Sequence, residues 1–347
     1  MTPHALGIHR SLDPPGVLPQ TARRLDATPR ALENEIAVDV RALNVDSASF
    51  HQLLDTERAT GETVSRQILR IVAERGKMQN PVTGSGGIFL GDVREIGPRH
   101  PDARTLRAGD RIASLVSLTL TPLAIDRIRG VLASSDRVEL DGMAILFERT
   151  LWARMPEDLP EEVALAAFDV AGAPASVLRR AQPGQTLVMI GTGKAGLLCL
   201  AAAREAVGPS GRIVAIDPSE AASGRARGLG YADEVLSLDA RDPVAVQSAV
   251  RDATKGTMAD LVVNVVNAPG TETASVLAAK DEGTVLLFGM ATSFSAAALG
   301  AEGAAHPATL LIGNGYVPGH AETALGLLRR HPRLAAVFAG LSGAGGP

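Results

Sequence analysis

The apolar run Thr186–Ile190 leads directly into a glycine-rich turn and then into an Ala-rich helical segment. The turn has the spacing G-x-G-x-x-G and consists of Gly191, Thr192, Gly193, Lys194, Ala195 and Gly196. Glycines at this spacing permit a tight turn, close approach of the backbone to a pyrophosphate, and close packing of helix on strand. The helix start also presents unpaired N–H groups and a positive dipole end to phosphates. The sequence therefore predicts a Rossmann dinucleotide-binding unit.

A second predicted strand, residues 212–216, ends at Asp217, which lies 21 residues beyond Gly196. A carboxylate in this place accepts hydrogen bonds from the ribose hydroxyls of adenosine and repels a 2′-phosphate, so the pattern favours NAD over NADP. The alternative is a surface Asp that caps a helix. Because strand, turn, helix, strand and acid follow in the expected order, we interpret Asp217 as a cofactor-binding residue.

The second half of the chain alternates strands with helices, which predicts βαβ units and a doubly wound parallel sheet. Further strands are predicted at 260–265, 284–288 and 310–317. Ligands of such sheets lie beyond the carboxyl ends of the strands. We therefore expect six residues near the nicotinamide, with ordinary loop positions as the alternative: Val265, Val266, Asn267, Phe288, Gly289 and Met290.

The last predicted strand, 310–317, carries few charges and is expected at the edge of the sheet. A long apolar edge strand invites pairing with another chain. We therefore expect a homodimer formed through this edge.

The first half of the chain shows a different pattern of predicted strands and helices. Short strands are predicted at 35–44, 93–97, 111–118 and 142–151, with one helix at 63–74. This pattern indicates a mixed, mostly-β domain. We expect a catalytic domain over residues 1–157, a Rossmann domain over 158–340 and a flexible tail at 341–347, with NAD and substrate between the two domains.

Composition excludes several classes of protein. The net charge of −4 and the absence of a basic run argue against a nucleic-acid partner. The single cysteine, Cys199, cannot form an internal disulfide or a multi-cysteine metal site, and is interpreted as a buried apolar residue. We expect no secretory signal and no membrane span, hence a cytoplasmic enzyme that acts on a small molecule.

The order of these parts resembles the medium-chain dehydrogenase/reductase superfamily over nearly the whole chain. The resemblance implies an α/β fold in which a GroES-like, mostly-β catalytic domain precedes the Rossmann domain. Zinc members carry a Cys after the first strand and Gly-His-Glu in the second glycine-rich segment. The matching positions here are Asp46 and Gly86-Gly87-Ile88, and no Cys lies near Phe168. The resemblance therefore implies that no catalytic zinc is bound.

Four stretches are more specific: HRSLDPPGVLPQTARRLD at 9–26, GKMQNPVTGSGG at 76–87, ASLVSLTLTPLAI at 113–125 and GMAILFE at 142–148. They resemble the L-erythro-3,5-diaminohexanoate dehydrogenase family. The resemblance implies NAD-dependent oxidative deamination of a 3,5-diamino acid to a 5-amino-3-oxo acid and ammonia, in bacterial lysine fermentation.

Such a substrate brings two ammonium groups, and acids should meet them. Asp46 is one candidate, because it falls at the position of a zinc ligand; a helix-cap acid is the alternative. Glu148 ends the apolar run AILFE, where an unpaired carboxylate is costly, and a surface strand end is the alternative. Asp169 lies in the apolar stretch AAFDVAGA.

Oxidation of an amine also requires a base that removes its proton. Lys77, one of only four lysines, opens a glycine-rich segment, and a desolvated lysine loses pKa. A solvated loop lysine is the alternative. His51 follows the first strand, and Asn80 would orient polar groups of the substrate or simply form a turn. No motif identifies the catalytic base among these residues.

Two alternatives to this function fit parts of the sequence. A quinone or enoyl reductase of the same superfamily would usually prefer NADPH, against which Asp217 argues. A non-catalytic NAD-binding protein would keep the glycines but would not need clustered acids and a lysine.

Overall fold

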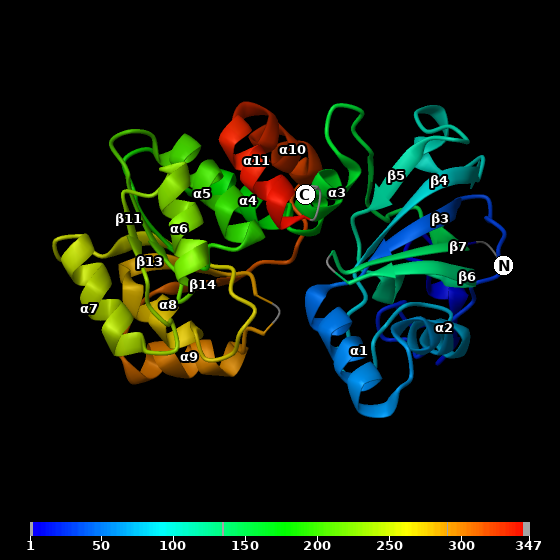
Figure 1. Cartoon of the computed structure of the whole chain (residues 1–347), viewed down its shortest axis with the longest axis horizontal. Coiled ribbons are helices and arrows are strands. Elements are labelled where there is room, and N and C mark those ends of the chain that lie inside the picture. The colour runs from blue at the N-terminus through cyan, green and yellow to red at the C-terminus, as the bar shows by residue number, and fades with distance from the viewer. Residues whose placement is uncertain (1–2, 134, 290, 343–347) are drawn as a thin grey trace. The chain divides into compact units, whose positions relative to one another are not determined.

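The computed structural model describes residues 3–133, 135–289 and 291–342 of the chain (Figure 1). The chain forms two compact units, Met1–Glu161 and Glu162–Pro347. Each has its own sheet and its own hydrophobic core, and each is described by itself.

Unit 1 is built on a six-stranded sheet with the order β6-β7-β3-β4-β5-β8. All of its strand pairs are antiparallel. The strands are β3 (Ile36–Asn44), β4 (Ile88–Ile96), β5 (Arg111–Ser114), β6 (Leu123–Leu132), β7 (Arg137–Leu146) and β8 (Trp152–Arg154).

Two helices lie between β3 and β4 in the chain and cover the core of unit 1. They are α1 (Ser47–Thr60) and α2 (Val64–Arg75). The apolar residues of α2 recur at helical spacing, and Val64, Ile68 and Val72 are buried in the core of unit 1, where α2 packs against β6. Thr63 caps the start of α2 by accepting from the N–H of Arg66, and Gly76 ends it in the left-handed conformation.

An N-terminal arm, residues 3–34, packs on unit 1. It contains η1 (Ile8–Arg10) and the antiparallel pair β1 (Ser11–Asp13) and β2 (Arg24–Leu25). The arm is anchored by Glu35, which is fully buried and forms an ion pair with Arg10 at 2.6 Å. The Arg10 guanidinium also donates to the carbonyls of Asp26, Thr28 and Arg30.

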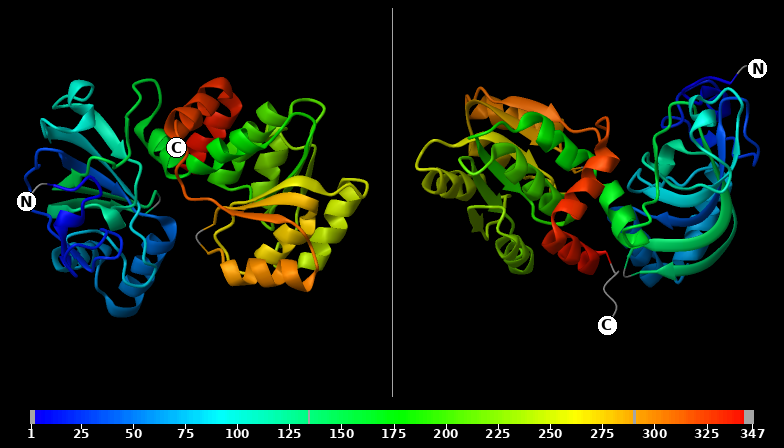
Figure 2. Two further views of the ribbon diagram at one scale, coloured as in Figure 1. Left: turned by 180° about the vertical axis from the view of Figure 1, so that it is seen from behind. Right: turned by 90° about the horizontal axis from the view of Figure 1, so that it is seen from above.

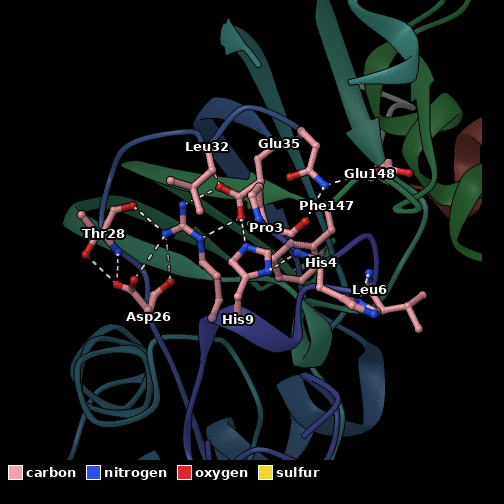
Figure 3. Close-up of polar contacts among 12 residues, drawn as sticks. Pro3, His4, Leu6, His9, Asp26, Thr28, Leu32, Glu35, Phe147 and Glu148 are labelled. Carbon is pink, nitrogen blue, oxygen red and sulfur yellow. Dashed lines mark hydrogen bonds and ion pairs between the residues drawn. The ribbon is translucent and has the colours of Figure 1, made fainter. Parts of the chain in front are cut away.

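His9 completes this anchor (Figure 3). The backbone N–H of His4 donates to His9 Nδ1 at 2.9 Å, so the ring proton is on Nε2, which donates to Glu35 at 2.8 Å. Burial alone would raise the pKa of Glu35, but the hydrogen bonds from His9 and Arg10 lower it below the usual 4.5. Glu35 is therefore ionised in the folded protein at neutral pH.

Unit 2 is a doubly wound parallel sheet with the strand order β11-β10-β9-β12-β13-β14. The strands are β9 (Thr186–Ile190), β10 (Arg212–Ile216), β11 (Glu234–Leu236), β12 (Ala259–Asn264), β13 (Ala279–Leu287) and β14 (Thr309–Ile312). The predicted fold class is confirmed: an antiparallel, mostly-β unit precedes a parallel α/β unit.

Helices cover both faces of the unit 2 sheet (Figures 1 and 2). One group is α4 (Gly172–Arg180), α5 (Lys194–Val207), α6 (Glu220–Leu229), α10 (His320–Arg330) and α11 (Pro332–Leu341). The other is α7 (Pro243–Ala253), α8 (Glu272–Ala278) and α9 (Phe294–Gly303). Helix α3 (Glu161–Asp169) begins where the two units join in the chain.

Several predicted bounds were wrong. The strand predicted at 310–317 is only Thr309–Ile312, because glycines at 313 and 315 break the extended run; Gly315 has φ +74°. The strands predicted at 111–118 and 142–151 are Arg111–Ser114 and Arg137–Leu146. Of the tail predicted at 341–347, Leu341 ends α11, and 343–347 lie outside the described residues. In the described part of the chain, no helix is long and apolar enough to cross a membrane.

We predict that Glu35→Gln destabilises unit 1 by about 3 kcal/mol, because it leaves the buried Arg10 charge with only the more distant Asp26 carboxylate, at 3.7 Å, as its counter-charge. The lowered pKa of Glu35 means that its contribution is complete above pH 4.5 and is lost as the pH falls through the folded value. The difference between variant and wild type should therefore shrink in acid. Urea unfolding followed by the fluorescence of Trp152, the single tryptophan, reports on unit 1.

Glu33→Gln is the matched control, because Glu33 pairs with Arg99 at an exposed position. Its removal should cost less than about 1 kcal/mol. Equal losses from the two variants would contradict the anchoring role of Glu35.

Candidate functional site

The glycine-rich turn of unit 2 joins the end of β9 to the start of α5. Gly191 has φ +95°, which disfavours any residue with a side chain. Gly196 lies so close to this turn that a Cβ would come within 2.0 Å of the Gly191 carbonyl oxygen. Two of the three glycines are therefore required by the backbone itself.

Gly193 differs from the other two. It has φ −70°, which any residue adopts, and a Cβ would meet no atom within 4 Å. The fold therefore gives no reason for a glycine there, whereas close approach of a pyrophosphate does. No side chain caps the first turn of α5, so its N–H groups are left for an anion. Lys194, the first residue of α5, and Ala195 are both partly exposed beside Gly193. This arrangement fits a dinucleotide phosphate.

Asp217 follows β10 directly and faces the same turn. Its Oδ2 accepts from the N–H of Thr192 at 2.7 Å and from the Thr192 hydroxyl at 3.1 Å, and its Oδ1 accepts from the N–H of Ser219 at 2.9 Å. The carboxylate thus links the ends of two adjacent strands. A carboxylate has about four acceptor positions, so Asp217 keeps capacity for a ribose hydroxyl.

Two loops follow the neighbouring strands β12 and β13. Val265 and Val266 are partly buried, and Val266 packs against Gly191, where a Cβ would lie 2.8 Å from its Cγ2. Asn267 is exposed and accepts from the N–H of Ala291. Phe288 and Gly289 begin the second loop, and Met290 lies outside the described residues. The parallel pairing places these loops beside the glycine-rich turn.

In unit 1, Asp46 and Asn80 both bind the backbone of Ser49 near the start of α1. Asp46 Oδ1 caps the helix by accepting from the N–H of Ser49 at 3.0 Å, and Asp46 Oδ2 is a buried atom with no hydrogen-bond partner among the described residues. Asn80 is fully buried and donates to Gln52 Oε1, while its own oxygen accepts from the N–H of Val82. The amide of Asn80 is therefore occupied in holding a turn against α1.

His51 lies on the exposed side of the same helix. Its Nδ1–H donates to the carbonyl of Ser47 at 2.7 Å, one turn earlier. His51 is thus close to Asp46 in the sequence, and its ring nitrogen is bound to the backbone of α1.

Lys77 has a fully buried side chain whose ammonium donates to the carbonyl of Pro19 at 2.8 Å. Burial, together with the charge of Arg75, lowers the pKa of Lys77 to about 8. The preceding Gly76 also touches the arm, since a Cβ there would lie 2.1 Å from the Leu25 carbonyl oxygen. Residues 76–77 therefore contact the N-terminal arm. This contact is enough by itself to explain why the side chain of Lys77 is buried.

The two remaining acids lie elsewhere. Glu148 follows β7 and accepts from the Asn34 side chain at 2.9 Å, beside Phe147 and the arm (Figure 3). Asp169 ends α3 and is exposed. Asp46 and Asn80 thus share Ser49 as a hydrogen-bond partner, whereas Glu148 binds Asn34 of the arm.

Sequence reasoning missed Asn264 and Glu272, both 2% exposed in unit 2. Asn264 ends β12 and accepts from the N–H of Val266, and Glu272 begins α8. An Asn that closes the apolar strand ADLVVN was a usable signal, whereas nothing in the sequence marks Glu272 as buried.

No group of three or more His, Cys, Asp or Glu side chains within residues 3–133, 135–289 and 291–342 could hold a metal ion.

Comparison with known families gives two matches. Residues 9–156 match the family described as L-erythro-3,5-diaminohexanoate dehydrogenase N-terminal domain, and residues 195–309 match the zinc-binding dehydrogenase family. A protein of Acetoanaerobium sticklandii named L-erythro-3,5-diaminohexanoate dehydrogenase is 45% identical over 93% of this chain and 94% of its own length. A protein of the same name from Fusobacterium nucleatum is 44% identical over 96% of each chain.

Solved structures share the fold at low identity. An alcohol dehydrogenase from Thermotoga maritima has a TM-score of 0.57 and 16% identity, with 90% of this chain and 86% of that chain covered. The CurK enoyl reductase has a TM-score of 0.56 and 14% identity, over 92% and 91% of the two chains. A mycobacterial protein complexed with NADPH has a TM-score of 0.54 and 21% identity, over 90% and 83%.

We predict opposite effects of alanine at two of the glycines. Gly196→Ala should destabilise unit 2 by about 1–3 kcal/mol, because its Cβ meets backbone. Gly193→Ala should fold normally and yet weaken NADH binding at least about tenfold, because its Cβ would occupy the space that a pyrophosphate requires. Thermal unfolding and calorimetric titration with NADH separate the two effects. Normal NADH binding by Gly193→Ala would show that the phosphate does not lie there.

Proposed function

Because this chain belongs to the L-erythro-3,5-diaminohexanoate dehydrogenase family, we propose that it oxidatively deaminates L-erythro-3,5-diaminohexanoate with NAD and water, giving 5-amino-3-oxohexanoate, ammonia and NADH in lysine fermentation. The chain is an enzyme, an oxidoreductase that acts on an amino group. The observation that carries the proposal is the identity of about 45% to relatives of that name along nearly the whole chain.

The geometry of unit 2 supports the choice of NAD. When bound, the nicotinamide accepts the hydride that leaves C3 of the substrate. The glycine-rich turn and the start of α5 would hold the pyrophosphate, and the loops after β12 and β13 would surround the nicotinamide half. Asp217 places a negative charge where a 2′-phosphate would have to lie, which favours NAD over NADP.

Charge matching governs the substrate side of the reaction. The C3 amine must lose a proton before hydride leaves, and the positive charge that then develops at C3 is best met by a carboxylate. Asp46 is the acid best suited, because one oxygen caps α1 and the other has no hydrogen-bond partner among residues 3–133, 135–289 and 291–342, so it keeps capacity to accept one. A second acid is needed for the C5 ammonium, and Glu148 and Asp169 are the candidates kept from the sequence. Lys77, whose amine donates to the carbonyl of Pro19, remains a candidate for the base that takes the C3 proton.

The direct test follows NADH formation by absorbance with purified enzyme, NAD or NADP, and L-erythro-3,5-diaminohexanoate. We expect turnover with NAD at a kcat/KM at least about tenfold above that with NADP. A panel of β-hydroxy acids and quinones provides the comparison substrates. Lack of activity on the diamino acid would refute the proposed substrate, and equal use of NADP would refute the role of Asp217.

A separate prediction concerns Asp46. Asn is as good a helix N-cap as Asp, so Asp46→Asn removes the charge and keeps the cap. We expect kcat/KM for the diamino acid to fall about 30-fold or more, as for loss of a paired charge, while the NADH dissociation constant changes less than twofold. Asp55→Asn, an exposed acid of the same helix, is the control and should be silent.

Glu148→Gln and Asp169→Asn complete the series. If Asp46→Asn turns over within threefold of wild type and one of the other two variants loses much activity, the carboxylate that binds the substrate is assigned to that other residue. Full activity in all three variants would refute the acidic site.

We also propose that the enzyme is a homodimer joined at β14. This strand is an edge of the unit 2 sheet, and its Ile312 is 66% exposed; Phe294 and Leu299 of α9 are 69% and 65% exposed. Unpaired backbone groups and apolar side chains on one edge favour pairing with a second copy of the chain. Sedimentation at micromolar concentration tests this; a monomer alone would refute it.

A further inference from the structure

Glu272 is a charged side chain that is only 2% exposed and has no role in the site described above. Its Oε2 accepts from the N–H of Gly270 at 3.0 Å, and its Oε1 accepts from the N–H of Ser293 at 2.7 Å. Burial of a carboxylate is costly unless hydrogen bonds compensate for lost water. Here both bonds come from backbone, and the two donors belong to different loops.

These loops are the two that follow β12 and β13. A second bridge joins them, since Asn267 Oδ1 accepts from the N–H of Ala291 at 3.0 Å. They also touch directly, because a Cβ at Gly289 would lie 2.0 Å from the Val266 carbonyl oxygen. These contacts therefore connect the two loops to each other, and Glu272 is more buried than Asn267, the other side chain that joins them.

Asn264 fixes the first loop from the other side. Its side-chain oxygen accepts from the N–H of Val266 at 2.9 Å, and its nitrogen donates to the hydroxyls of Thr271 and Ser275, each at 2.9 Å. The loop is thus held at its start by the end of β12 and at its close by Glu272. Such a loop pays little ordering cost when it binds a ligand.

We infer that Glu272 is a positioning residue for the nicotinamide half of the cofactor: it fixes the paired loops after β12 and β13 in the conformation that binds. The inference rests on the proposed use of a nicotinamide cofactor. It separates the two halves of the site, because the adenosine and pyrophosphate would be held by the glycine-rich turn and Asp217, which Glu272 does not contact through the hydrogen bonds described.

The test compares two ligands in one set of variants by calorimetry. NADH carries the nicotinamide, whereas ADP carries only the adenosine and pyrophosphate. In Glu272→Gln, an amide NH2 faces one of the two N–H donors, so one bond is lost and replaced by repulsion. We expect the NADH dissociation constant to rise about tenfold, and that for ADP to stay within twofold of wild type.

Glu205→Gln is the matched control. Glu205 lies in the last turn of α5, at the far end of that helix from the glycine-rich turn, and is bonded to Arg330 and His331. It should change neither constant. Hydrogen exchange without ligand supplies a direct readout: the amides of Gly270 and Ser293 should exchange faster in Glu272→Gln, whereas those of β9 should not.

A second variant distinguishes the loss of a contact between the two loops from misfolding of Glu272→Gln. Asn267→Ala removes the other bridge at an exposed position, and should weaken NADH binding selectively and by less than Glu272→Gln. Equal weakening of NADH and ADP, or unchanged NADH binding, would overturn the inference. Wild type that binds NADPH in place of NADH would refute only the NAD preference, and the same variants would then be compared with NADPH. Wild type that binds neither would refute the proposed function and the inference together.

Discussion

The close contact between α5 and the end of β9 is the constraint on which the cofactor unit depends. With 2.0 Å between the Gly191 oxygen and any Cβ at Gly196, helix and strand approach as nearly as two backbones can. That approach aims the uncapped N-terminus of α5 across the carboxyl edge of the sheet. The adjacent strands then bring Asp217 and the paired loops to the same edge. One steric requirement in a hexapeptide thus sets the geometry of the rest of the unit.

Four acidic side chains of this protein accept hydrogen bonds from backbone N–H groups. Asp46 caps α1, Asp217 joins two strand ends, Glu272 joins two loops and Glu35 accepts from the N–H of Leu32. Each carboxylate is thereby oriented before any ligand arrives, and hydrogen bonds from fixed donors lower the cost of burying its charge. Asp46 is distinguished from the others by its second oxygen, which is buried and unused.

The sequence predicted most where local patterns decide the structure. Strands 186–190 and 212–216 were predicted with their observed bounds, because apolar runs there end at a glycine or a polar turn. Helix α1 was missed, since its sequence SASFHQLLDTERAT is largely polar, and the strand predicted at 310–317 ran too far into apolar residues separated by glycines. Lys77 binds Pro19, 58 residues earlier in the chain, and Glu272 binds Ser293, 21 residues later, and no local pattern encodes such contacts.

The buried cations Arg10 and Lys77 bind carbonyl groups of the N-terminal arm. Arg10 binds the carbonyls of three arm residues, and Lys77 binds that of Pro19. Carbonyls are the same in every residue, so these anchors recognise the path of the chain and not the identity of its side chains. A substitution at an exposed side chain of the arm therefore leaves these hydrogen bonds in place, whereas a substitution of Arg10 or Lys77 removes them.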